Sequence, residues 1–257
     1  MVNLLRNNPL THFSRGFFYP FAGGRFLMKT PRLWKYVLIP FLINTVIFSL
    51  AVWLGLDFFN NRVETMIPSG DAWYWATLYY FLWLVAVVLT AVLVFFSFTV
   101  VGNLISSPFN DLLSEKTELA IRGKAEGVPF SLREIGRILV DECRKLVVFV
   151  IGMVLLLLLN FIPGFGTLLY SVLSFLFTVY FLAIQYTSYV FGRKGQGFRE
   201  QRRFIGGRMF MAFGFGTGVL CLLAIPFLQF FCIPLAVVGA TRMWCDQLSP
   251  TGPGEVL

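Results

Sequence analysis

Three basic side chains surround the point where the first long apolar segment begins. Lys29, Arg32 and Lys35 flank Thr30-Pro31, a cap residue followed by proline, which is typical of a helix start. The first turn of a helix offers free backbone N–H groups and a partial positive charge, and both attract anions. The cluster indicates an inorganic-anion site. The simpler alternative, which composition alone favours, is a basic cluster that only sets membrane orientation.

A second polar group follows the second long apolar segment. Glu118 and Arg122 are four residues apart, the spacing that pairs charges on a helix, and we expect them on a solvated face. Asn110 and Glu115 lie nearest the predicted exit from the membrane, so they are candidates for a polar pathway. Asn44, inside the first apolar segment, is expected to hydrogen-bond to another helix.

A third cluster is strongly basic and lies between two apolar segments. Contact with anionic lipid headgroups is the simpler interpretation, and a vestibule that attracts an anion is the sharper one. The cluster comprises Arg193, Lys194, Arg199, Arg202, Arg203 and Arg208.

The residues that enzymes need are not arranged for catalysis. The only histidine is His12, the four cysteines lack metal-ligand spacing, and no phosphate-binding loop or nucleophile motif is present. The Gly214-Phe-Gly216-Thr-Gly218 pattern lies in an apolar segment, where it favours close helix packing. We therefore expect no enzymatic activity, no cofactor and no metal.

Composition places the chain among membrane proteins. Apolar residues make up 57% and charged residues 13% of its 257 residues, whereas soluble domains carry about 25% charged residues. The net charge of +8 is spread over loops between apolar segments, which argues against nucleic-acid binding. We predict an all-α integral membrane protein forming one membrane domain over residues 1–257.

The hydrophobic pattern predicts the elements that position these clusters. They are an interfacial N-terminal segment (1–30), a first span (33–56), a second span (73–101), a cytoplasmic helical arm (103–145), and two apolar pairs (147–184 and 209–241). We expect the second span to continue as one helix past Pro108 into the arm. We expect a second helix of the arm to begin at the capping box Ser131-Leu-Arg-Glu134 and to enter the membrane at Val147.

Each apolar pair consists of segments that are short for a bilayer and are joined by an uncharged turn. They divide as 147–162 with 167–184, and as 209–224 with 227–241. Two interpretations remain open from length alone: four short or tilted spans, or two hairpins that enter the membrane and return.

Charge bias predicts the orientation. Residues 1–35 hold six Lys and Arg, 103–145 hold seven and 186–208 hold six, whereas the 57–73 connector has one. The positive-inside rule places these three basic blocks, and with them the N-terminus, in the cytoplasm of a multi-pass protein.

Five motifs are distributed over nearly the whole chain. They are Leu38-Ile-Pro40-Phe-Leu-Ile-Asn44, Asn103-Leu-Ile-x-x-Pro108-Phe-Asn110-x-Leu112-Leu-x-Glu115, Phe161-Ile-Pro163-Gly-Phe-Gly166, Ala183-Ile-Gln185-Tyr186 and Pro234-x-Ala236-Val-x-Gly239-Ala240-Thr-x-Met243-Trp244. In these motifs, and in their order, the chain resembles the CysZ-type bacterial sulfate permeases, within the etoposide-induced membrane-protein family.

The resemblance implies two long spans, two half-inserted hairpins and assembly as a homo-oligomer in the bacterial inner membrane. It also implies proton-linked or channel-like uptake of sulfate for cysteine biosynthesis. Where the family reads Gly-Leu-Arg after a proline, this chain reads Pro31-Arg32-Leu33-Trp34-Lys35. Leu33 matches, and Lys35 partly matches a second Arg that often follows the motif.

Two functions from different classes therefore stand. The first is an anion permease in which Arg32, Leu33 and Lys35 bind the anion while Asn110, Glu115 and Asn44 form a polar pathway. The second, favoured by the altered motif, is a scaffold or regulatory membrane protein of the same fold that does not transport.

Overall fold

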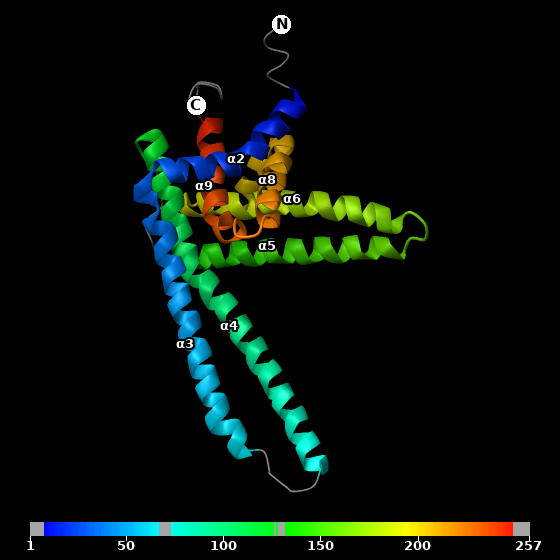
Figure 1. Cartoon of the computed structure of the whole chain (residues 1–257). Helices are drawn as coiled ribbons and strands as arrows, with labels where there is room; N and C mark the ends of the chain where they lie inside the picture. Colours follow the sequence, from blue (N-terminus) through cyan, green and yellow to red (C-terminus); the bar gives the residue numbers. More distant parts are fainter. Residues whose placement is uncertain (1–7, 67–72, 126, 128–131, 249–257) are drawn as a thin grey trace. The chain divides into compact units, whose positions relative to one another are not determined.

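The computed structural model describes residues 8–66, 73–125, 127 and 132–248, and regular structure in this part of the chain is helical throughout (Figure 1). The prediction of an all-α protein is confirmed. The helices are α2 (Pro9–Lys29), η1 (Pro31–Leu33), α3 (Lys35–Met66), α4 (Trp73–Arg122), α5 (Leu132–Leu158), η2 (Leu159–Phe161), α6 (Gly166–Arg193), α7 (Phe198–Gly206), α8 (Met209–Ala224) and α9 (Gln229–Leu248).

Several of these helices are long and apolar enough to cross a bilayer. They cover Pro31–Gly55, Val140–Phe161 and Gly166–Arg193, and a fourth span is possible if α7 and α8, which meet at 102°, count as one. The length of about 20 apolar residues needed for a span is reached in each of the three. The protein is therefore an integral membrane protein.

The chain forms two compact units, one of residues 1–34 with 110–257 and one of residues 35–109. The smaller unit contains α3 and the first part of α4. Asn44 Nδ2 donates to the Ser106 hydroxyl at 3.1 Å and approaches the Gly102 carbonyl at 3.5 Å. The predicted hydrogen bond from Asn44 to another helix is thus present.

The boundaries of α3 and α4 differ from the predicted spans. One turn of 3-10 helix precedes α3, which begins at Lys35 and continues to Met66. α4 is a single helix of 50 residues that passes through Pro108, so the predicted continuity of the second span with the start of the arm is confirmed.

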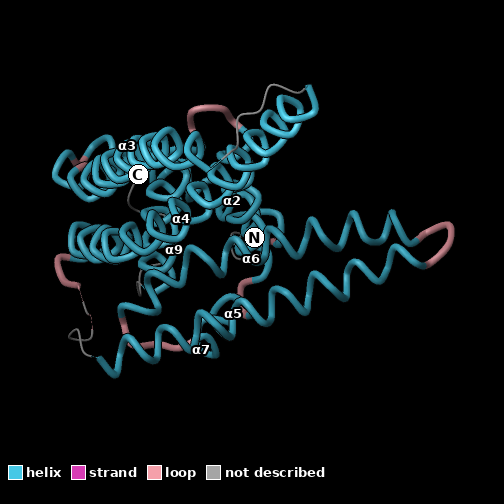
Figure 2. Tube along the Cα trace, turned by 90° about the horizontal axis from the view of Figure 1, so that it is seen from below, coloured by secondary structure: helices cyan, strands magenta, loops and turns pink. Residues whose placement is uncertain are grey.

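In the larger unit, α5 and α6 form a long antiparallel hairpin in both views (Figures 1 and 2). α5 joins the amphipathic residues after Leu132 to the apolar run without a break, and α6 continues to Arg193. Their 27 and 28 residues exceed the apolar segments predicted for them. The rings of Phe149, Phe177 and Phe181 pack between the two helices.

The second hairpin, α8–α9, packs against α2 at very short backbone distances. α8 has the predicted bounds, whereas α9 extends past Thr241 to Leu248. A Cβ atom at Gly214 would lie 2.0 Å from the Phe13 carbonyl of α2, and one at Gly216 would lie 1.8 Å from the Val179 carbonyl of α6. The prediction that this glycine pattern serves close helix packing is confirmed.

Candidate functional site: a basic pocket beside a buried glutamate

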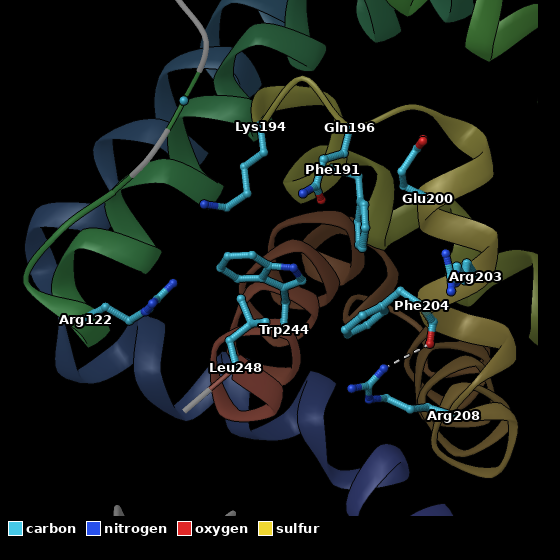
Figure 3. A pocket seen from close by; sticks show the side chains of 11 residues that line it. Arg122, Phe191, Lys194, Gln196, Glu200, Arg203, Phe204, Arg208, Trp244 and Leu248 are labelled. Atoms are coloured by element: carbon cyan, nitrogen blue, oxygen red, sulfur yellow. Dashed lines mark hydrogen bonds between the residues drawn. The ribbon is translucent and has the colours of Figure 1, made fainter. Parts of the chain in front are cut away.

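A pocket of about 820 Å³ opens in the larger unit where α4, α6 and α9 end and α7 begins. Figure 3 shows Trp244 near its centre, with Lys194 and Arg122 to one side and Phe204 and Arg208 to the other. The described lining residues are Arg122, Gly127, Phe191, Lys194, Gln196, Glu200, Arg203, Phe204, Arg208, Trp244 and Leu248.

Cations dominate this pocket. Among its described lining residues, Arg122, Lys194, Arg203 and Arg208 face a single acid, Glu200. A concave surface with such a charge excess raises the local concentration of anions. Three of the four cations, Lys194, Arg203 and Arg208, come from the third basic cluster of the sequence, and for these three residues the geometry favours the vestibule interpretation.

The Arg208 guanidinium is held in place. Its Nε donates to Gln247 Oε1 at 3.0 Å, and its Nη1 donates to the Phe204 carbonyl at 3.3 Å, the dashed line in Figure 3. The group also lies 4.4 Å from the centre of the Phe204 ring. Because Arg208 is already ordered, less side-chain entropy is lost when an anion binds to it.

Trp244 positions the cations on the opposite side. Its ring centre lies 4.2 Å from Lys194 Nζ and 5.5 Å from Arg122 Cζ, within the range of cation–π attraction. Only 5% of Trp244 is exposed. The sequence analysis noted Trp244 only as part of a family motif and did not connect it with the basic cluster.

Glu118 lies behind these cations and is completely buried. Lys194 Nζ donates to it at 2.9 Å, Arg122 Nη1 at 3.4 Å, and Arg193 pairs with its second carboxylate oxygen. The predicted pairing of Glu118 with Arg122 is confirmed. The expected solvated face is wrong for Glu118, because the end of α6 covers that face of α4.

Glu118 belongs to a row of polar residues at every fourth position of α4: Asn110, Ser114, Glu118 and Arg122. Ser114 is fully buried and accepts from Thr241 Oγ1 of α9 at 3.1 Å. Asn110, 7% exposed, has its Nδ2 3.5 Å from the Tyr189 hydroxyl of α6. This polar row of α4 begins in the basic pocket and continues into the packed interior of the larger unit.

The two predicted pathway residues on α4 therefore differ. Asn110 lies in the polar row, whereas Glu115 lies one position away from it. The Glu115 side chain is 35% exposed, and its Oε1 is 2.6 Å from Nζ of the neighbouring Lys116. A four-residue periodicity search from Asn110 would have found Ser114 and Glu118.

Asp111, next to Asn110, is a weaker acid than an ordinary aspartate, because its pKa is raised. Burial raises the pKa of its carboxyl from 3.8 to about 7, the Arg193 guanidinium opposes that shift, Glu142 reinforces it, and Lys145 opposes it. The group is therefore partly protonated near neutral pH. Nothing in the sequence singled out Asp111 from the other acids of this helix.

The predicted anion-binding residues lie around the start of α3. Arg32 is exposed in η1, Leu33 is buried, and Lys35 is exposed with its Nζ 5.0 Å from the centre of the Tyr36 ring. The described lining of the basic pocket includes neither Arg32 nor Leu33. Asn44 and Lys35 belong to the smaller unit, and Asn110 and Glu115 belong to the larger one.

Comparison with known proteins identifies the family. The family model described as "Sulfate transporter CysZ/Etoposide-induced protein 2.4" matches residues 19–234. The chain belongs to this family. Its CysZ-type relatives include a "Sulfate transporter CysZ" of Pseudomonas aeruginosa (strain LESB58), 36% identical over 228 residues that cover 87% of this chain and 92% of the relative.

A second member of the family is similar over almost all of this chain. The "Sulfate transporter CysZ" of Pectobacterium atrosepticum is 35% identical, with 96% of this chain and 91% of the relative covered. The CysZ family match spans α3 to α8 as well as about half of α2, so it includes the polar row of α4 and the basic residues of α7.

Proposed function

We propose that this protein transports sulfate into the bacterial cell across the inner membrane, and that the basic pocket is a station for the anion on its route. The family and the sulfate-transporter names of its relatives support transport over the scaffold alternative. The single observation that carries the role of the pocket is its excess of positive charge around the buried Glu118.

A divalent oxyanion fits the chemistry of this pocket. Arginine binds oxyanions through two parallel N–H groups, and lysine contributes a compact charge. In the absence of an anion, Glu118 neutralises part of the charge of Arg122, Arg193 and Lys194. Sulfate entering the pocket competes with Glu118 for Arg122 and Lys194, and this competition keeps its binding weak enough for release.

The polar row of α4 extends the proposed route beyond the pocket. Asn110 and Ser114 offer amide and hydroxyl donors without a fixed charge. Such groups replace part of the hydration of an anion without trapping it. Asn44 and Glu115 are proposed as further polar groups of the route. Asn44 belongs to the smaller unit, and Glu115 is a partly exposed residue of the larger one.

Arg32, Leu33 and Lys35 are proposed as the residues that capture the anion at the start of the first span. Both cations are exposed and adjacent to a helix start. The positive-inside rule supports a cytoplasmic N-terminus. Assembly as a homo-oligomer and use of the sulfate for cysteine biosynthesis follow from the family resemblance and belong to the same proposal.

Uptake of radiolabelled sulfate by proteoliposomes tests the role of the pocket. Charge-assisted hydrogen bonds contribute about 1.5–3 kcal/mol each, so replacing two cations should lower sulfate uptake at least about tenfold. The variant is Lys194→Gln with Arg208→Gln, and the control is Arg199→Gln, an exposed α7 residue outside the described pocket lining. Uptake unchanged in the double variant would remove the pocket from the route.

The capture residues are tested separately by Arg32→Ala with Lys35→Ala. A capture role predicts that the sulfate concentration for half-maximal uptake rises while the maximal rate changes little. If neither quantity changes, these two residues take no part in transport, and the pocket result stands on its own.

A further inference from the structure

A groove of about 580 Å³ lies between α5 and α7 on the larger unit, and its lining differs from that of the basic pocket. Its walls are three valines and a phenylalanine, with two arginines and one cysteine among them. The described lining residues are Val140, Cys143, Arg144, Val147, Val148, Phe198 and Arg202.

The α5 side of the groove is one face of the helix. Its residues lie at positions i, i+3, i+4, i+7 and i+8, the spacing of a single helical stripe. Val140 is 49% exposed, and Val147 is 55% exposed. On the α7 side, Phe198 is buried and Arg202 lies over its ring at 5.7 Å.

The groove continues into the lipid-facing surface of the protein. The candidate membrane span Val140–Phe161 begins at the groove. Beyond Val148 the same helix exposes Ile151 and Leu155, each more than half exposed. The groove is therefore apolar toward the membrane, and its charge comes from Arg144 and Arg202.

We propose that this groove binds one anionic phospholipid, with the phosphate on Arg202 and Arg144 and an acyl chain over Val140, Val147 and Val148. The arginines match a phosphate in charge and geometry, and the valines match an acyl chain. A free sulfate ion would leave water for a largely apolar wall, which is unfavourable.

In this arrangement Arg144 contacts both Asp141 and the lipid phosphate. Arg144 Nη1 lies 3.3 Å from Asp141 Oδ1, and the Arg144 side chain is 68% exposed. An exposed pair of this kind is weak, so it leaves Arg144 available to a headgroup. Arg202 supplies the other half of the phosphate contact.

Cys143 provides a native reporter, because it lines the groove and is exposed, whereas Cys232 and Cys245 are buried. The experiment measures the rate at which a maleimide modifies Cys143 in nanodiscs of phosphatidylcholine with and without phosphatidylglycerol. The site of modification is read by peptide mass spectrometry. We expect phosphatidylglycerol to slow modification of Cys143 and phosphatidylcholine alone to leave it fast.

The arginines should account for this protection. Each contributes about a fivefold gain in affinity for an anionic headgroup, so the pair favours phosphatidylglycerol over phosphatidylcholine by roughly tenfold or more. The variant Arg144→Gln with Arg202→Gln should lose the protection. The control Arg199→Gln, on α7 like Arg202 but outside the described groove lining, should keep it. Native mass spectrometry should show the matching loss of one retained phosphatidylglycerol.

Two results would overturn the lipid assignment. One is an equal rate of Cys143 modification for the wild-type protein in nanodiscs with and without phosphatidylglycerol. This comparison does not depend on whether a variant folds. The other is equal protection by soluble glycerol phosphate or sulfate without phosphatidylglycerol, which would make the groove a free-anion site. Sulfate uptake by proteoliposomes is a separate measurement, so failure of the lipid site leaves the transport proposal untouched.

Discussion

The two helical hairpins of the larger unit have similar compositions and different surroundings. Both are strongly apolar and turn at an uncharged segment containing proline. In the apolar part of the candidate span Val140–Phe161, only 6% of the residues are buried in the protein. In α8, Met211, Phe215, Val219 and Leu222 are buried against neighbouring helices.

Glycine spacing explains the difference. Gly214 and Gly218 of α8 and Gly16 of α2 allow the backbones of these two helices to approach closely. Gly216 of α8 does the same against α6, and Gly23 of α2 does so against α9. The membrane part of α5 has only Gly152 and keeps large side chains on its surface. Apolar content therefore identifies both hairpins as membrane segments, and the small residues decide which of them is buried in protein.

The largest effect is expected from filling the closest backbone contact of α8. Gly216→Val places a Cβ where the Val179 carbonyl of α6 lies, and neither backbone can move without separating the helices. We expect no folded protein after extraction in mild detergent, as measured by size-exclusion chromatography. The control is Gly136→Ala in α5, where a Cβ would meet nothing within 4 Å. A normal elution profile for Gly216→Val would refute the packing argument.

The second prediction concerns the ion pairs of the buried Glu118, which connect α4 with the end of α6. Glu118→Gln leaves Arg122, Arg193 and Lys194 without their buried carboxylate, which costs about 3–5 kcal/mol. At about 2–4 °C per kcal/mol, the Tm in detergent should fall by roughly 6–20 °C. Glu115→Gln removes a partly exposed ion pair on the same helix. Such a pair contributes at most about 1 kcal/mol, so this variant should lower the Tm by only a few degrees.

The same variant links stability to the proposed anion site. If sulfate binds these cations, millimolar sulfate should raise the Tm of Glu118→Gln more than that of the wild type, because the anion replaces the missing charge. An equal or absent shift would indicate that sulfate does not reach this cluster.

The third prediction compares one valine in each hairpin. Val219 of α8 is fully buried, and Val154 of α5 is 50% exposed. Val219→Ala removes two buried methyl-sized groups and should cost about 1.5 kcal/mol. Val154→Ala in detergent should change stability by less than about 0.5 kcal/mol. Thermal unfolding of the two variants measures the difference, and equal losses would mean that the hairpins are equally buried.

The sequence predicted the helical class, the membrane location, the bounds of α8 and the basic character of the 193–208 region. These features are set locally, by runs of apolar residues and by charge. Burial of Glu118 and the place of Trp244 among the cations could not be predicted, because they depend on which helices cover the end of α4. Periodicity shows that two residues share a helix face, and only tertiary packing shows whether water reaches that face.

The continuity of α5 is a feature that the sequence does predict. Apolar residues recur at helical spacing before Lys145, and an apolar run follows without a turn signal, so the pattern predicts one helix, and α5 is one helix from Leu132 to Leu158. A helix satisfies its own backbone hydrogen bonds in water and in lipid, so a change in composition along it does not end it.

The smallest effect is expected at the base of the first hairpin, where Asp111 of α4 is influenced by Glu142 and Lys145 of α5 and by Arg193 of α6. Burial raises the pKa of Asp111 from 3.8 to about 7, so its contribution to stability is complete below about pH 4 and is lost as pH rises through 7. Asp111→Asn cannot ionise and should escape this loss. We expect its Tm to exceed that of the wild type at pH 8 and the excess to be smaller at pH 5. A Tm difference independent of pH would show that Asp111 is ionised throughout this range and that its neighbours stabilise the charge.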